Sequence, residues 1–418
     1  GAEYCHGEVD NRVYELVSPH GFLASFQPLA EGNKSVYVNS SGYVYDTELV
    51  QNLIDEAMGS AVYDKDSKLF NGSMAEFVTP RLDALLHSKN VDPRLSEALK
   101  HWIPVTSGVL SAADSLDVLG ARGSSDYKDC EGDNNLKWKN GTRGYITLFD
   151  IISKKIPTPS EELPVVNKTV LGKHVTKVER KEGEVEVTCA DGSTYLADHV
   201  IVTVSLGVLK KHAADMFHPA LPADKTAAIE TMGFGCVGKV FMLFPNRWWP
   251  EDINEFYPLF SQSEIEKLKA TSAYGSWLVD VVDISGAMNH DRILCGWFGG
   301  QACRAMESLT EEQVTDGLLE LLNIIVGDSY NITRPEAILR TTWASNPNTL
   351  GSYSYHTVAS DNRNVSNSDL AESILEENSK PVLLFAGEAT HPHYWATVHG
   401  ALDTGRREAN KLIDYFNL

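Results

Sequence analysis

The segment that most constrains the fold lies close to the C-terminus. Residues 382–385 form an apolar run that predicts a buried strand, and the run leads directly into Gly387 and Glu388. After an aromatic loop, residues 397–409 predict a helix that begins with a hydroxyl residue and soon contains a glycine. The first amides of a helix have no partner within it and attract negative charge. The sequence therefore predicts a strand, a turn and a helix that together hold an electron-rich ring. The alternative is an ordinary strand–turn–helix at the end of an α/β domain.

This segment resembles the C-terminal FAD motif of the flavin-containing amine oxidases, especially the polyamine and spermine oxidases of animals. Nearly every position of that motif is matched. Further stretches resemble the same family in the same order, and the resemblance covers nearly all 418 residues, being weakest from 20 to 135. These stretches are residues 1–14, 144–152, 171–178, 197–210, 238–250 and 343–355.

The resemblance implies an α/β (α+β) chain with the FAD-binding amine oxidase fold, in two discontinuous domains. Two domains also agree with the length of the chain. The FAD-binding domain is expected at residues 1–20, 136–208 and 360–418. A substrate-binding domain with a mixed sheet and helices is expected at residues 21–135 and 209–359.

One part of the family's FAD domain has no counterpart here. In the family, a βαβ unit whose Gly-x-Gly-x-x-Gly turn binds the FAD pyrophosphate precedes the matched residues. The only literal match, residues 233–238, follows a predicted helix (224–232) and opens a predicted strand (239–244), so we reject it as a phosphate loop. Three explanations stay open: a separate or lost N-terminal fragment after cleavage, a shortened sequence, or a family member that has lost its flavin site.

Lys239 and His6 are the catalytic candidates. A charged lysine is unusual in an apolar strand, although a lysine at the strand's edge can extend its ammonium to solvent. The resemblance implies that Lys239 holds a water against N5 of the flavin. It also implies that His6 faces the substrate amine, a role that suits a group with a near-neutral pKa. A structural histidine is the alternative for His6.

The resemblance also assigns binding residues. Aromatic walls can hold a cationic methylene chain by cation–π contact, although core packing is the alternative for each ring taken singly. The expected substrate contacts, besides His6, are Tyr353, Tyr355, Tyr394, Trp395 and Thr397. The expected contacts to non-covalent FAD are Val175, Trp343, Gly387, Glu388, Thr397 and Val398. Tyr4 and Arg12 replace a usual tryptophan and proline, so the preferred amine stays open.

Charge and apolar patterning limit the partners. The formal net charge of −21 opposes nucleic-acid binding and favours a small cationic amine as substrate, although acidity can also serve solubility alone. No apolar run approaches the length of a membrane span. The six cysteines show no CxxC pair and no metal-ligand spacing, so we expect no metal site, and one or two disulfides at most.

Glycosylation sequons indicate the compartment. Seven Asn-X-Ser/Thr triplets occur where about three are expected by chance, which favours a secreted or lumenal glycoprotein. They begin at Asn33, Asn39, Asn71, Asn140, Asn167, Asn331 and Asn364.

Three functions follow from these observations. The first is FAD-dependent oxidation of polyamines or related amines, with hydride transfer to the flavin and reoxidation by oxygen to give hydrogen peroxide and an aldehyde. The second is a secreted, catalytically silent binding or storage protein on the same fold. The third, an L-amino-acid oxidase, needs an arginine for the substrate carboxylate, and no motif match supplies one.

Overall fold

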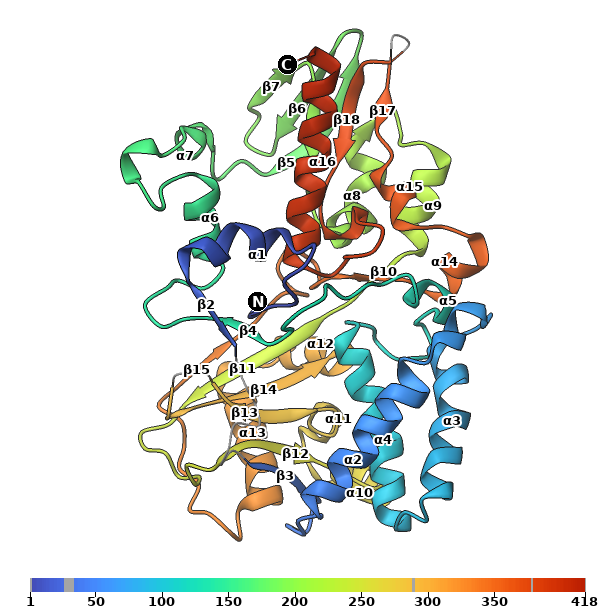
Figure 1. The fold of residues 1–418 in the computed structure, drawn as a ribbon, viewed down its shortest axis with the longest axis vertical. Coiled ribbons are helices and arrows are strands. Elements are labelled where there is room, and N and C mark those ends of the chain that lie inside the picture. The colour runs from blue at the N-terminus through green and yellow to red at the C-terminus, as the bar shows by residue number, and fades with distance from the viewer. Residues whose placement is uncertain (1, 26–33, 288–289, 377–378, 418) are drawn as a thin grey trace. The chain divides into compact units, whose positions relative to one another are not determined.

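The chain divides into two compact units in the computed structural model, which describes residues 2–25, 34–287, 290–376 and 379–417 (Figure 1). Unit 1 comprises Gly1–Gln27, Asp126–Met232 and Asn364–Leu418, and unit 2 comprises Pro28–Ser125 and Gly233–Arg363. Unit 1 thus runs to residue 232, past the expected boundary at 208. That one unit binds flavin and the other binds substrate remains a prediction.

A three-stranded sheet in unit 1 contains the C-terminal strand. Strand β18 is buried throughout and lies between β17, which is antiparallel to it, and β8, which is parallel to it. Helix α16 follows the loop after β18 and begins at the predicted place. The bounds are β8 (Val200–Val202), β17 (Ile374–Leu375), β18 (Pro381–Phe385) and α16 (Val398–Phe416).

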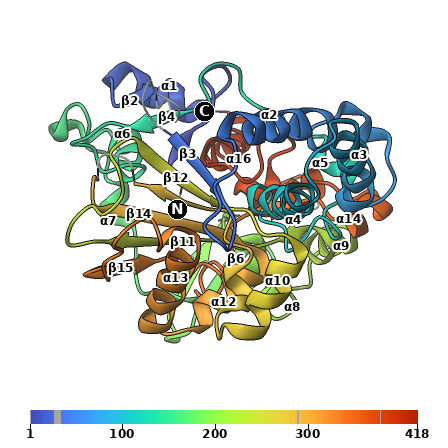
Figure 2. The same ribbon diagram turned by 90° about the horizontal axis from the view of Figure 1, so that it is seen from below.

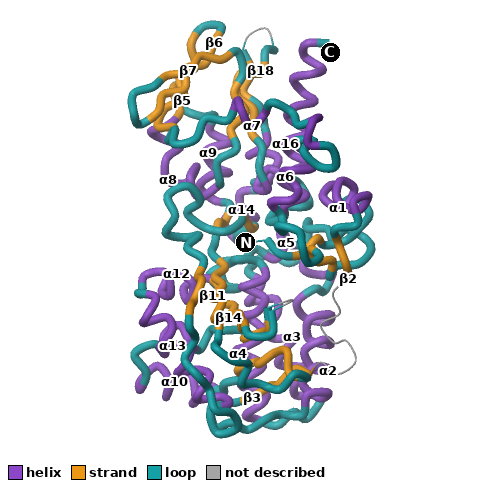
Figure 3. Tube along the Cα trace, turned by 90° about the vertical axis from the view of Figure 1, so that its left-hand side faces the viewer, coloured by secondary structure: helices purple, strands orange, loops and turns teal. Residues whose placement is uncertain are grey.

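Unit 1 contains two further sheets. Asp191 and Gly192 are a sequence pair typical of a hairpin turn, and they join β6 to β7. Strand β6 lies between β7 and β5 (Figure 3). In the other sheet β4 pairs with β1 and β2, so that the N-terminal segment lies against residues 136–138. The strands are β1 (Tyr4–Cys5), β2 (Leu23–Ser25), β4 (Leu136–Trp138), β5 (Val175–Lys181), β6 (Glu184–Cys189), β7 (Thr194–Ala197) and β9 (Phe217–His218). The helices are α1 (Arg12–Val17), α6 (Ile146–Ile152), α7 (Val165–Lys168), α8 (Leu206–Met216), α9 (Ala223–Thr231) and α15 (Asn367–Ala371).

A six-stranded sheet organises unit 2, in the order β15-β11-β14-β13-β12-β3. Its pairs are antiparallel except β12 with β3, so the sheet is mixed, as expected. Helices α12 and α13 lie along one side of β11 and β14 in Figure 2, and their apolar side chains join those of the sheet in one core. The strands are β3 (Lys34–Val38), β11 (Val237–Leu243), β12 (Ile253–Pro258), β13 (Asp283–Gly286), β14 (Ile293–Gly299) and β15 (Ala337–Arg340).

A second core of unit 2 is helical and is built mainly by α2, α3 and α4. Capping side chains fix the helix starts: Asp46 and Asp92 accept bonds from first-turn amides, and Ser73 forms a capping box with Glu76. The helices of unit 2 are α2 (Thr47–Ala57), α3 (Met74–Ser88), α4 (Pro93–Leu110), α5 (Ala121–Ser124), α10 (Gln262–Thr271), α11 (Gly275–Leu278), α12 (Gly300–Ser308), α13 (Glu311–Val326) and α14 (Val358–Arg363).

The glycine-rich stretch at 233–238 follows helix α9 and leads into strand β11, as predicted, although its first two residues form a short strand of their own. Strand β10 (Gly233–Phe234) pairs with β16 (Ser354–Tyr355), and β11 begins at Val237. Across the described ranges, no helix combines the length and the apolar character that a membrane crossing requires.

Candidate active site

The turn after β18 leaves its backbone open. Gly387 has φ +137°, a conformation that favours glycine, and no atom lies within 4 Å of the position that a Cβ would take there. Its amide donates to Thr404 Oγ1 at 3.0 Å, which ties the turn to α16. The carboxylate of Glu388 accepts a bond from the Ala396 amide at 2.6 Å and so holds the loop between the turn and the helix.

The start of α16 is fixed from the same loop. Thr397 Oγ1 accepts a bond from the Gly400 amide at 3.0 Å and donates to the Tyr394 carbonyl at 2.7 Å. A Cβ on Gly400 would lie 2.0 Å from that carbonyl, so only glycine fits. Val398, the first helical residue, packs against the core around β4. The structure therefore brings Gly387, Glu388 and the start of α16 together as expected.

Two histidines flank Tyr394. Amides of His393 and Tyr394 donate to His391 Nδ1 at 3.1 and 2.7 Å, so its proton lies on Nε2, which faces Asp403 Oδ2 at 3.4 Å. The Tyr394 ring stacks on His391 at 4.8 Å and meets His399 edge-on at 5.1 Å. Burial lowers the pKa of both imidazoles, that of His399 to about 4. Both rings are therefore neutral at neutral pH.

His399 and Cys130 are members of this cluster that we did not predict. His399 Nε2 lies 3.7 Å from Cys130 Sγ, and burial raises the pKa of that thiol. His399 lies inside the matched helix motif, where it could have been noticed, whereas Cys130 stands in a polar segment without a signal.

His6 lies in unit 1 with its side chain exposed, and its Nδ1 is 3.0 Å from the Asn134 carbonyl. Neighbouring protein atoms desolvate the ring and lower its pKa, although the Asn134 and Asp129 oxygens oppose this. Its charged form also contributes to the low pKa of His399, so the two rings interact. His6 thus presents a mostly neutral imidazole to solvent at neutral pH.

Lys239 is buried in the interior of the unit 2 sheet. Only 6% of it is exposed, and β11 lies between β14 and β15, so its ammonium does not extend to solvent from the strand's edge. Lys239 is the direct cross-strand partner of Trp297 in β14, and its ammonium lies 3.8 Å from the centre of the indole ring. The Lys239 amide donates to Thr341 Oγ1, and the Lys239 carbonyl accepts a bond from the Thr341 amide, both at 3.0 Å.

The predicted aromatic walls differ in exposure. Tyr355 and Trp395 are 7% and 5% exposed; Tyr355 packs in the helical core, and Trp395 meets Tyr127 edge-on at 5.3 Å. Burial favours core packing for these two rings. Tyr353 and Tyr394 are half-buried, and the Tyr353 hydroxyl donates to the Val109 and Leu110 carbonyls.

The comparisons with known proteins identify the family. Residues 10–413 match the model of the flavin-containing amine oxidoreductases. The chain belongs to this family. It is 28% identical to the peroxisomal N(1)-acetyl-spermine/spermidine oxidase of Bos taurus, over 99% of this chain and 84% of that protein. It is 26% identical to the probable polyamine oxidase 5 of Arabidopsis thaliana, over 100% of this chain and 88% of that protein.

A solved structure supports the fold. A double mutant of putrescine oxidase matches 99% of this amine oxidase and 88% of its own chain, with a TM-score of 0.65 and 16% sequence identity. The predicted fold class, the amine oxidase family and the enzyme class are therefore confirmed.

FAD, bound non-covalently, is the cofactor of this amine oxidase. Two observations fit it: the bare backbone at Gly387, and the capped helix start whose first amides favour negative charge. Val175 at the start of β5 and the half-buried Trp343 of unit 2 stay predicted contacts.

The cysteines form one disulfide, and most of the sequon asparagines are exposed. One disulfide, Cys236–Cys303, is present, and Cys5, Cys130, Cys189 and Cys295 are buried thiols outside it. Asn39 is 7% exposed, and Asn33 lies outside the described residues. The other five sequon asparagines, which are Asn71, Asn140, Asn167, Asn331 and Asn364, are exposed.

Proposed function

We propose that this enzyme oxidises polyamines or closely related amines and releases an aldehyde and hydrogen peroxide. The observation that carries the proposal is the match along 99% of the chain to a relative named as a peroxisomal N(1)-acetyl-spermine/spermidine oxidase. The net charge of −21 agrees with a polycationic substrate, because an acidic protein raises the local concentration of cations.

When bound, FAD would supply the redox chemistry, as acceptor of a hydride from the carbon beside the amine nitrogen and as donor of electrons to oxygen. The chain's own residues bind and orient the cofactor and the substrate. The first amides of α16 would favour negative charge on the bound cofactor. The Tyr394 ring, held between His391 and His399, offers a rigid π-face to a cationic chain.

His6 and Lys239 have distinct roles in this proposal. A neutral His6 accepts a hydrogen bond from the substrate nitrogen without repelling it, since the reacting amine must lose its proton before it gives up hydride. The buried ammonium of Lys239 is a hydrogen-bond donor that holds a water molecule in place.

Peroxide release with a panel of amines tests the proposal. FAD-loaded protein is given spermine, N1-acetylspermine, a monoamine and an L-amino acid, and peroxide is measured by a coupled peroxidase assay. We expect turnover with the polyamines and little with the amino acid. Peroxide from the amino acid alone, or none with any amine from protein that has bound FAD, would contradict the proposal.

Two further predictions concern the compartment of the protein and a separate N-terminal fragment. We propose that the protein is secreted or lumenal, supported by the exposed sequons. A separate N-terminal fragment that completes the FAD site finds no support in the comparisons. A companion peptide in the denatured mass spectrum of natively sourced protein is the observation that would revive it.

A further inference from the structure

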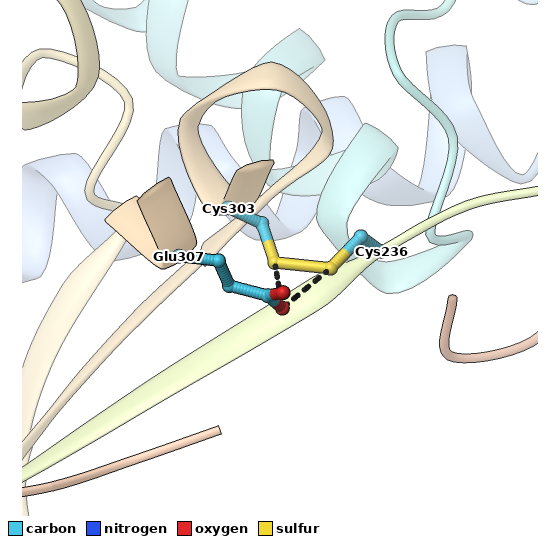
Figure 4. Close-up of side chains that lie close together, drawn as sticks. All are labelled: Cys236, Cys303 and Glu307. Carbon is cyan, nitrogen blue, oxygen red and sulfur yellow. Dashed lines mark hydrogen bonds between the residues drawn. A yellow bond between two sulfur atoms is a disulfide. The ribbon is translucent and has the colours of Figure 1, made fainter. Parts of the chain in front are cut away.

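A disulfide and a carboxylate converge in unit 2, at the start of the strand that carries Lys239 and beside the segment that follows Trp343. Cys236 immediately precedes β11, and Cys303 lies in α12, one helical turn before Glu307. Figure 4 shows the three side chains pointing toward one another: Glu307 Oε1 lies 3.6 Å from Cys236 Sγ and 3.7 Å from Cys303 Sγ. Within the described ranges, this is the one group of three or more His, Cys, Asp or Glu side chains whose possible ligand atoms all lie within 4.8 Å of one another.

The carboxylate of Glu307 is held in place by a third segment. The Ala344 amide donates to Oε1 at 3.0 Å and the Ser345 amide donates to Oε2 at 2.7 Å. These bonds fix the orientation of the carboxylate and leave lone pairs on both oxygens. Metal-ligating carboxylates are usually supported by hydrogen bonds of this kind.

The ligand types select one class of cation. Two cysteine sulfurs and one carboxylate oxygen are typical ligands of Zn²⁺ and of softer cations such as Cd²⁺, and poor ligands for Mg²⁺ or Ca²⁺. Both sulfurs are fully buried and Glu307 is half-buried, so the approach from solvent is on the carboxylate side.

We propose that the Cys236–Cys303–Glu307 cluster is a redox-controlled metal site, which binds one divalent zinc-class cation after the disulfide is reduced. A dithiol supplies two electrons and two protons, the S–S bond breaks to give two thiols, and the dithiol becomes a disulfide. When the cation binds, the two thiols release two protons. The cation then offsets the repulsion among two thiolates and a carboxylate.

The two states exclude each other, because each sulfur either bonds the other sulfur or ligates the cation. Both states link the start of β11, the strand of Lys239, to α12. The reduced, cation-free state lacks this link. The three protein ligands leave a fourth position for water.

Metal titration of the intact, FAD-loaded chain tests the proposal. The protein is reduced with excess dithiothreitol and desalted without oxygen, and its released thiols are counted. It is then titrated with Cd²⁺ while the sulfur-to-metal charge-transfer absorbance is recorded. We expect one Cd²⁺ per chain after reduction and none before it, and we expect Cd²⁺ to restore the thermal midpoint that reduction lowers.

Three variants assign the site. C236S/C303S should lose the absorbance. E307Q should keep the disulfide but weaken Cd²⁺ binding at least about tenfold, since loss of even an outer partner costs about 10–100-fold. C130S, which removes the buried thiol beside His399, should bind Cd²⁺ as the unaltered chain does.

Three results would overturn the proposal. The first is charge-transfer absorbance that persists in C236S/C303S, the second is unchanged affinity in E307Q, and the third is a disulfide that stays closed under excess dithiol. E307Q retains both cysteines, so it decides the matter even where the double variant does not fold.

Discussion

Replacing the buried lysine of β11 separates a catalytic role from a structural one. Lys239→Met keeps the length and volume of the side chain and removes its charge and its donors. The lost contact of the ammonium with Trp297 is worth about 0.5–2 kcal/mol. The substitution also removes the cost of burying a charged group, since Lys239 is only 6% exposed, and this gain offsets much of the lost contact energy. We therefore expect the free energy of unfolding to change by no more than about 2 kcal/mol.

The catalytic effect should be much larger. If the Lys239 ammonium holds the water that assists flavin chemistry, its removal should slow reduction or reoxidation of the flavin about 10²-fold or more, with FAD still bound. Stopped-flow absorbance measures each half-reaction separately, and thermal unfolding measures stability on the same preparation. Unchanged rates in both half-reactions would refute the catalytic role and leave Lys239 as a packing partner of Trp297.

Lys225 offers a matched control in unit 1. It is 3% exposed and lies 4.0 Å over the Phe385 ring, and its ammonium donates to the Asp369 and Leu370 carbonyls at 3.0 and 2.7 Å. Lys225→Met leaves two buried carbonyls without these donors, at about 1–3 kcal/mol each. The control should therefore lose stability while its half-reactions stay near the unaltered rates.

Three further predictions concern charge, pH and modification. The kcat/KM for spermine should fall more steeply with added salt than that for a monoamine, since steering scales with ligand charge; parallel salt slopes would mean that the charge of −21 serves solubility. The pKa of His399 is lowered to about 4 in the fold, so the unfolded chain binds the extra proton first. Stability should thus be lost as pH falls from about 6.5 to 4, by about 3 kcal/mol at most, and His399→Gln should flatten that decline in urea unfolding. Peptide mapping after glycosidase treatment should find glycans on the exposed sequons and none on Asn39, whose Oδ1 accepts bonds from Ser41 and from the Tyr43 amide; a glycan on Asn39 would contradict this.

Local sequence signals predicted the parts of the fold that depend on neighbouring residues. The apolar run of β18, the hydroxyl cap at Thr397 and the turn at Asp191 and Gly192 each gave the right element, because strand burial, helix capping and hairpin turns are local properties. The context of residues 233–238 was likewise enough to reject a phosphate loop.

Long-range pairing could not be predicted in this way. The cross-strand partner of Lys239 is Trp297, and that pairing follows from sheet register, which no local pattern encodes. The same holds for the bond between Cys236 and Cys303, which are 67 residues apart. The burial of Tyr355 depends on the packing of helices in unit 2, so its ring could not be told from an exposed substrate contact.

Anaerobic reduction of the bound flavin by spermine tests the central claim most directly. FAD-loaded protein should absorb at about 450 nm, as this cofactor does. The absorbance should bleach when spermine is added in the absence of oxygen. Admission of oxygen should restore the absorbance and release one equivalent of peroxide per flavin. Protein that binds FAD but keeps its full absorbance with spermine, N1-acetylspermine and monoamines alike would contradict the assignment of this chain as a polyamine-oxidising enzyme.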